Sequence, residues 1–142
     1  EDVFAIADVV CTLTPSRDPL VQGSWFKPGQ HINAVGARPR PSDREVDSKG
    51  MARSRVIVDS LATAQEKSGE VLLAIEEGEF ALEDIVAELG EVVAGQKTGR
   101  QTAADITLFN SVGIGILDLA IGRLLIDSAC EQGIGRHIDL SA

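Results

Sequence analysis

The sequence contains no tyrosine, and aromatic residues make up only 4 % of its 142 residues. So few aromatic side chains make a stacking platform for nucleic-acid bases unlikely to form. Basic residues are also scarce, because 13 lysines and arginines stand against 22 aspartates and glutamates and leave a net charge of −9. Nucleic acids and anionic membranes both need a basic surface, so we expect neither as a partner.

The chain also has few cysteines and no long apolar run. Two cysteines, Cys11 and Cys130, are too few for a disulfide scaffold and are typical of cytosolic thiols. No segment has the ~18 uncharged apolar residues that a membrane-spanning helix needs, and residues 1–4 do not have the pattern of a signal peptide. His31 and His137 have no ligand partners at metal-binding spacing. We therefore expect a cytoplasmic protein without a metal site.

The sequence does have the balance of a globular protein, with 44 % hydrophobic and 25 % charged residues. Its length suits one domain over residues 1–142. Three apolar runs rich in β-branched residues, at 7–14, 30–36 and 55–60, predict strands buried on both faces. Their spacing of about 20 to 25 residues suits βαβ crossovers. We therefore expect an α/β fold with a parallel sheet of about three strands.

The remaining segments predict helices. They lie at 19–26 (a short helix or turn), 41–54, 61–69, 81–90 and 105–132. The helices at 61–69 and 81–90 each end at a glycine, where a left-handed C-cap is usual. In the longest segment, the charged residues Asp118, Arg123, Asp127 and Glu131 are interpreted as one narrow polar stripe. A helix that is apolar on most sides is expected to be buried on most sides.

Charge is unevenly distributed along the chain. Residues 38–55 hold six basic residues against three acidic ones, and residues 66–91 hold nine acidic residues against Lys67. The ordinary interpretation is two solvated faces. The alternative is that the basic stretch meets an anionic ligand or a carboxylate substrate.

Small polar residues follow each predicted strand, at 12–16, 33–37 and 59–61. In an open parallel sheet, ligands bind beyond the carboxyl ends of the strands. Hydroxyls, an asparagine and a glycine, Gly36, which allows close approach to the backbone, could line a ribose and a nicotinamide. The same residue types also mark the turns that follow buried strands, and composition leaves both interpretations open.

The start of the long apolar segment contains two further candidates. Asn110 and Ser111 could cap the helix, or its first amides could bind an anion or a ligand carbonyl. Gly113 and Gly115 lack the third glycine of a G-x-G-x-x-G loop, so we interpret them as sites of close helix packing. Cys11 is expected to act as a small buried hydrophobe, because it lies in a predicted strand.

Six stretches together carry a family resemblance. They are ADVVCTLTPSRDPL (7–20), GSWFKPGQHINAVGA (23–37), DREVD (43–47), ARSRVIVDS (52–60), ELGEVVAGQKTGR (88–100) and DITLFNSVGIGILDLA (105–120). In this order and spacing, which cover nearly the whole chain, they resemble the ornithine cyclodeaminase/mu-crystallin family. The combination of HINAVG with the VIVDS and TLFNSVG segments is specific to that family.

The resemblance implies a Rossmann-like NAD(P)-binding domain joined to a second domain that binds substrate and forms dimers. It also implies hydride transfer at the α-carbon of an amino acid or at an imine, as in cyclodeaminases, alanine dehydrogenases, ketimine reductases and opine-type dehydrogenases. NAD or NADP would be the cofactor. By correspondence with the family, the dinucleotide would contact Thr14, the backbone at Val35, Gly36 and Ala37, and Ser111.

Two departures from the family bear on activity. Arg38 stands where cyclodeaminases have an aspartate proposed as the general base, and a guanidinium cannot act as that base. This favours the mu-crystallin-like or reductase branch. The resemblance also begins partway through the nucleotide-binding domain, so the glycine-rich loop and the substrate domain are expected to precede residue 1.

Two functions follow as alternatives. The first is the C-terminal half of an NAD(P)-dependent oxidoreductase or cyclodeaminase, which alone binds the dinucleotide weakly and catalyses little. The second is a non-catalytic module that self-associates as a homodimer or higher homo-oligomer, because half a Rossmann sheet leaves an open edge. A small-ligand carrier without catalysis is a third, weaker interpretation.

Overall fold

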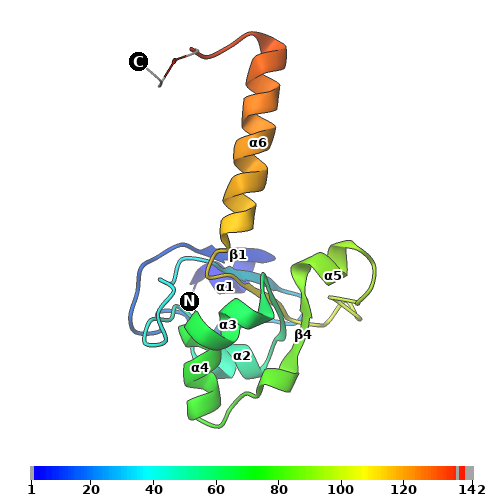
Figure 1. Ribbon diagram of the computed structural model, residues 1–142. Coiled ribbons are helices and arrows are strands. Elements are labelled where there is room, and N and C mark those ends of the chain that lie inside the picture. The colour runs from blue at the N-terminus through cyan, green and yellow to red at the C-terminus, as the bar shows by residue number, and fades with distance from the viewer. Residues whose placement is uncertain (1, 137, 140–142) are drawn as a thin grey trace.

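The computed structural model describes residues 2–136, 138 and 139, and its centre is a five-stranded parallel sheet (Figure 1). The strands are β1 (Val9–Thr12), β2 (His31–Ala34), β3 (Arg55–Val58), β4 (Ile85–Glu88) and β5 (Thr107–Asn110), in the spatial order β1-β2-β5-β3-β4. The helices are α1 (Asp2–Ile6), η1 (Gly23–Trp25), α2 (Ser48–Ala52), α3 (Leu61–Lys67), α4 (Gly69–Glu76), η2 (Leu82–Asp84), α5 (Leu89–Val93) and α6 (Gly115–Gln132). The α/β class is confirmed, and the sheet has two strands more than the sequence predicts.

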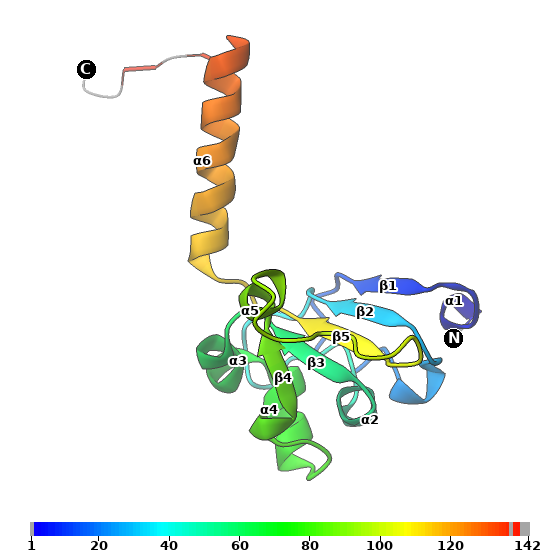
Figure 2. The same cartoon turned by 90° about the vertical axis from the view of Figure 1, so that its right-hand side faces the viewer.

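One face of the sheet forms the core. Val10, Ile32, Leu108 and Val56 occupy one register row across β1, β2, β5 and β3, and each is buried. Helices α2, α3 and α4 lie on this side of the sheet (Figure 2). Apolar side chains on this face therefore explain why the predicted strands at 7–14, 30–36 and 55–60 form β1, β2 and β3, each trimmed at its ends.

The opposite face is open over β1, β2 and β5. Val9 and Cys11 are exposed there, and Asn33 and Phe109 are half-buried. The expectation that Cys11 is buried is therefore wrong. β1 lies at the edge of the sheet and packs through only one of its two faces, so every second side chain of the strand remains in solvent.

Two predicted helices are strands at least in part. The segment 81–90 contains η2, β4 and the first residues of α5, and the segment 105–132 begins with β5 before α6. β5 lies between β2 and β3, so its run of apolar residues reflects burial in the sheet. A short apolar run has the same pattern in a buried strand and in a buried helix, so periodicity alone does not separate them.

The glycines expected to end two helices instead lie at helix beginnings. Gly69 is the first residue of α4, and Gly90 is the second of α5. A Cβ on Gly69 would lie 2.0 Å from the carbonyl oxygen of Asp43, so glycine is required for α4 to pack on that loop. Ser68 ends α3 and caps α4, accepting a hydrogen bond from the N–H of Val71.

The predicted polar helix at 41–54 forms only in part. Only Ser48–Ala52 is helical, because the Asp47 carboxylate caps α2 by accepting from the N–H of Gly50. Upstream, the carbonyl of Glu45 accepts from the N–H groups of Leu20 and Val21. This pairing holds residues 43–46 as an extended segment beside the loop that follows β1.

Helix α6 projects away from the sheet (Figures 1 and 2) and has no buried residue. The expectation that it is buried on most sides is therefore not met within the described chain. Arg123 and Asp127 pair on one face at 2.8 Å, but Asp118 lies five residues before Arg123 and hence about 140° around the helix. The polar stripe thus excludes Asp118. No helix among the described residues is both long and apolar enough to cross a bilayer.

Candidate functional site

The carboxyl ends of all five strands meet at one edge of the sheet. The last residues of the strands occupy a single register row, in the order Thr12, Ala34, Asn110, Val58 and Glu88. The loops that follow therefore lie side by side along this edge. The sequence-predicted residues Thr14, Val35, Gly36, Ala37 and Ser111 all belong to these loops or follow β5 directly. The topology thus brings together residues that are up to 97 positions apart in the chain.

Glu45 joins the ends of β1 and β2. Its side chain is fully buried, and each of its carboxylate oxygens accepts two hydrogen bonds. Oε1 accepts from the backbone N–H of Thr14 at 2.5 Å and from the Thr14 hydroxyl at 2.8 Å. Oε2 accepts from the Thr12 hydroxyl at 2.7 Å and from the N–H of Gly36 at 2.8 Å. A carboxylate offers about four acceptor positions, so these donors satisfy the buried group.

Gly36 lies against the backbone of the β1 loop. A Cβ at this position would be 2.2 Å from the nitrogen of Thr14 and 2.3 Å from the carbonyl carbon of Leu13. The sequence indicated that this glycine allows a close approach to the backbone. Within this chain the group that approaches Gly36 is the backbone of the loop after β1. Glu45 accepts hydrogen bonds from this loop and from the loop after β2, and so holds the two together.

A second buried carboxylate, Glu70 on α4, binds the backbone of Glu45. Its Oε1 accepts from the backbone N–H of Glu45 at 2.8 Å. Burial raises the pKa of the Glu70 carboxyl above its ordinary value, although the hydrogen bond from Glu45 acts in the opposite direction. Beside it, the Ser68 hydroxyl donates to Asn110 Oδ1 at 2.7 Å, and the Asn110 amide donates to the carbonyl of Ala34 at 3.3 Å. The network therefore connects α4 to β2 and β5.

Asn110 and Ser111 are not helix caps, because α6 begins at Gly115 after Ile114. Ser111 instead donates through its hydroxyl to Asp59, which follows β3. The same Asp59 oxygen accepts from the N–H of Gly113 at 3.1 Å. Gly113 has φ +82°, and neither Gly113 nor Gly115 has an atom within 4 Å of the place a Cβ would take. The expected close helix packing is absent from the described chain, and Gly113 serves a turn.

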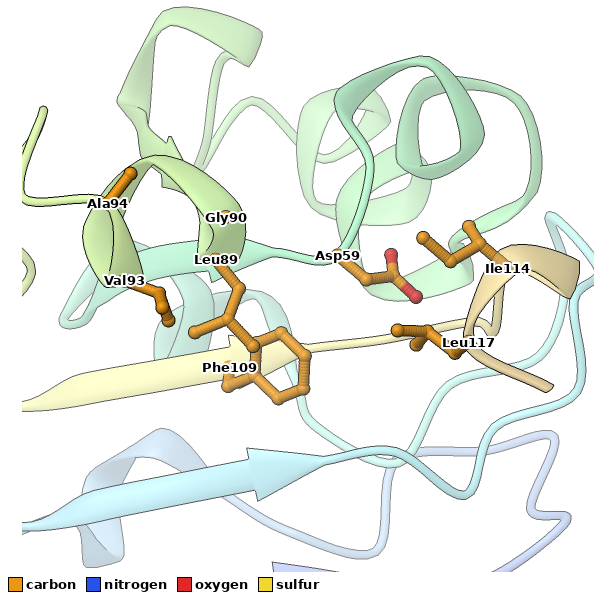
Figure 3. Close-up of a pocket in the computed structure, with 8 residues that line it drawn as sticks. All are labelled: Asp59, Leu89, Gly90, Val93, Ala94, Phe109, Ile114 and Leu117. Atoms are coloured by element: carbon orange, nitrogen blue, oxygen red, sulfur yellow. The ribbon is translucent and has the colours of Figure 1, made fainter. Parts of the chain in front are cut away.

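Next to Asp59 lies a cavity of about 410 Å³ (Figure 3). Leu89 and Val93 of α5, Phe109 of β5 and Leu117 of α6 contribute apolar side chains to its wall. The Asp59 carboxylate is its charged group, and that group already accepts hydrogen bonds from Ser60, Ser111 and Gly113. An apolar wall with one negative charge favours an apolar ligand group over a phosphate.

The basic stretch at 38–55 is largely used by the fold itself. Arg38 pairs with Asp43 at 2.7 Å, and Arg44 pairs with Glu77 at 2.7 Å. Burial acts to raise the pKa of Asp43, but hydrogen bonds from Ser42 and Arg38 outweigh it and hold that pKa below its ordinary value. Arg53 and Arg55 donate to backbone carbonyls. These contacts weaken the hypothesis that the stretch as a whole binds an anionic ligand.

His31 and the cysteines have no catalytic arrangement in the structure. One ring nitrogen of His31 contacts Thr107 of the neighbouring strand β5 at 2.8 Å. The other contacts Asn33 of its own strand, β2, at 3.2 Å. Across residues 2–136, 138 and 139, no cluster of histidine, cysteine and carboxylate side chains could hold a metal ion. His137 lies outside the described residues. Cys11 and Cys130 are both free and exposed.

Sequence reasoning missed the carboxylates that organise this edge, Glu45 and Glu70, and it assigned Asp59 no role. One signal was available for Glu45. Asp47 followed by Ser48 is a helix N-terminal pattern, which places residues 43–46 before the helix. An acidic residue beside Val46 in an extended segment could then have been considered for a buried role. Nothing local marks Glu70, because its partner is 25 residues away.

The family model for the ornithine cyclodeaminase/mu-crystallin family matches residues 1–133. The chain belongs to this family. A curated relative, the ketimine reductase mu-crystallin of Mus musculus, is 43 % identical over 122 residues, which are 86 % of this chain and 36 % of the mouse protein. The alanine dehydrogenase of Archaeoglobus fulgidus is matched over 40 % of its own length, and the Δ1-pyrroline-2-carboxylate reductase of Bacillus cereus over 42 %. The chain therefore spans less than half of these relatives.

Two solved structures share the fold at high similarity. The Δ1-pyrroline-2-carboxylate reductase of Thermococcus litoralis, in complex with NADH and L-proline, has a TM-score of 0.90 and 36 % identity over 96 % of this chain and 42 % of the reductase. An archaeal alanine dehydrogenase dimer with bound NAD has a TM-score of 0.82 and 36 % identity over 94 % of this chain and 41 % of that one. The sheet is therefore Rossmann-like, and the family includes NAD-binding oxidoreductases and a dimeric member.

Gly36→Ala should destabilise the protein, because the added methyl group meets backbone atoms that cannot rotate away. We expect a loss of about 1–3 kcal/mol in the free energy of unfolding, measured by urea denaturation. Gly90→Ala is the matched control, since Gly90 lies in α5 with nothing within 4 Å of a Cβ. An equal effect of both substitutions would contradict the close approach at Gly36.

Glu70→Gln should change how stability depends on pH. The raised pKa means that the folded state binds the Glu70 proton more tightly than the unfolded state. The contribution of Glu70 is therefore fully present below the ordinary glutamate pKa of about 4.5 and is lost as the pH rises toward the folded-state value. Urea unfolding at several pH values should show this loss in the wild type and a flatter profile in the variant. The exposed Glu83→Gln should follow the wild-type profile.

Proposed function

We propose that this chain supplies the nicotinamide side of the dinucleotide site in an NAD(P)-dependent oxidoreductase that acts on amino or imino acids. The observation that supports this most directly is the common strand-end edge, where Thr14, Gly36 and Ser111 come together. The similarity to a reductase complex with NADH and L-proline is consistent with the proposal. Ligands of open parallel sheets bind at such edges.

The groups at the edge fit one half of a dinucleotide better than the other. Thr14, Val35, Gly36 and Ser111 are half-buried, and Ala37 is buried, so the first four retain surface for contact with a ribose or a nicotinamide. No G-x-G-x-x-G pattern occurs in the sequence, and the Asp59 charge beside the cavity disfavours a pyrophosphate. When bound, the cofactor would supply the hydride, and these residues would bind and orient its nicotinamide end.

Arg38 favours a reductase over a cyclodeaminase. Its guanidinium is held by Asp43 and has no proton-accepting atom, so it cannot replace a general base. We therefore propose the ketimine reductase or imino-acid reductase branch, with an imine as the reducible group.

Binding can be tested on the chain as it is. Titration of the ¹⁵N-labelled protein with NAD⁺, NADH, NADP⁺ and NADPH should shift the amide resonances of Thr14, Gly36 and Ser111. Affinity should be weaker than micromolar, because the glycine-rich loop normally binds the pyrophosphate. Turnover of an imino acid with micromolar cofactor affinity would contradict the proposal that this chain supplies only the nicotinamide side of the site. The absence of any resonance shift at millimolar cofactor would contradict dinucleotide binding altogether.

Self-association is the second candidate, supported by the exposed apolar surface of α6. Ile121, Leu125 and Ile126 are 56 to 63 % exposed, and α6 buries no residue. Exposed apolar surface of this extent is typical of an interaction site. We propose a homodimer in which two copies of α6 cover one another, as an alternative to pairing through the open edge of β1.

Leu125→Glu tests this alternative. Leu125 lies on the side of α6 opposite Asp127 and is exposed, so a glutamate there should oppose the contact between two copies, and sedimentation velocity should show a shift from dimer to monomer. Ala120→Glu is the control, because residue 120 lies between Asp127 and Glu131 around the helix and should leave the dimer intact. A wild-type chain that is monomeric at high concentration would exclude the α6 dimer.

A further inference from the structure

The hydrogen-bond donors at the β1 and β2 loops are already committed within the protein. The N–H groups of Thr14 and Gly36 both donate to Glu45, and the N–H of Val35 donates to the carbonyl of Thr12 at 3.2 Å. The Thr14 hydroxyl has a single proton, and it also points to Glu45. A ligand at this corner therefore meets no free donor from these four groups.

The Thr14 hydroxyl oxygen retains acceptor capacity. A hydroxyl has one donor hydrogen and two acceptor lone pairs. Because Glu45 takes the hydrogen, the oxygen can only accept from a ligand. The side chain of Thr14 is half-buried and so retains accessible surface, whereas Glu45 itself is fully covered. Glu45 thus acts through Thr14 and through the two loop backbones, without touching a ligand.

We infer that Glu45 is a positioning residue that leaves the Thr14 hydroxyl able only to accept a hydrogen bond from a ligand, and that the ligand group that donates to it is the carboxamide NH₂ of the nicotinamide. The inference rests on the proposed dinucleotide function. The carboxamide nitrogen can only donate, so it matches this acceptor. A ribose hydroxyl can also donate, and a comparison of two dinucleotides that share both riboses but differ at the carboxamide separates the two groups. A carboxylate in the same place would have no hydrogen to offer and would lie near the negative charge of Glu45.

This assignment predicts discrimination between two dinucleotides that differ only at this group. NAD⁺ carries the carboxamide, and nicotinic acid adenine dinucleotide carries a carboxylate. In NMR titrations of the wild-type chain, NAD⁺ should bind about tenfold more tightly, which is the scale of one lost hydrogen bond with an unpaired partner. Equal affinities for the two would overturn the inference and leave the proposed function standing.

Two Thr14 variants test whether the hydroxyl itself, and not the shape of the loop, gives the preference for NAD⁺. Thr14→Val keeps the shape and the backbone N–H but removes the acceptor, so the preference for NAD⁺ should disappear. Thr14→Ser retains the hydroxyl and should restore the preference. A Thr14→Val variant that keeps the full preference would overturn the inference.

Glu45→Gln tests the positioning role directly. One acceptor oxygen becomes an NH₂ donor, which faces the N–H of Thr14 or of Gly36. In the unliganded variant, the amide proton resonances of these two residues should move upfield, and the preference for NAD⁺ should fall. Glu83→Gln removes an equal charge on the exposed surface and should change neither property.

These measurements distinguish the positioning role of Glu45 from dinucleotide binding itself. Unchanged Thr14 and Gly36 resonances in Glu45→Gln would show that Glu45 does not hold the loops, whatever the affinity. If Glu45→Gln does not fold, the two Thr14 variants carry the test alone. Failure of every dinucleotide to shift the wild-type spectrum would overturn both the proposed function and this inference.

Discussion

Four hydrogen bonds to one buried carboxylate determine the geometry of the sheet edge at the ends of β1 and β2. Glu45 comes from an extended segment between β2 and α2, yet it accepts from residues at or just after the ends of β1 and β2. A buried charge is costly unless its acceptor positions are all satisfied. The loops therefore cannot separate without leaving the carboxylate unpaired, and this constraint fixes the backbone positions of Thr14 and Gly36. The close approach at Gly36 is a consequence, since only glycine leaves room for it.

The same constraint extends into the helical layer. Glu70 and Ser68 connect the start of α4 to Glu45 and to Asn110 at the end of β5. Gly69 allows α4 to contact the loop at Asp43, whose carboxylate in turn holds Arg38. Arg38 is thus part of a structural ion pair.

The open surfaces of the chain have a different character. One face of β1 and nearly all of α6 are exposed, and both are rich in apolar residues. Relatives in the family are more than twice as long as the matched region. Exposed apolar surface of this kind is compatible with coverage by further protein, either from a longer polypeptide or from a second copy. The buried network and the open surfaces therefore differ in kind, since the first fixes the strand-end loops and the second leaves apolar side chains in solvent.

The sequence by itself determined the family, the α/β class and three of the strands. Short β-branched apolar runs are local signals, so β1, β2 and β3 could be located within two residues. The sequence also placed Thr14 and Gly36 at strand ends, whereas it placed Ser111 at the start of a helix. Tertiary structure alone decided that residues 107–110 form a strand, because their pattern also suits a helix and only pairing with β2 and β3 separates the two. It likewise decided that Glu45 is buried and Cys11 exposed. Both depend on contacts between residues more than 20 positions apart, which no local pattern records.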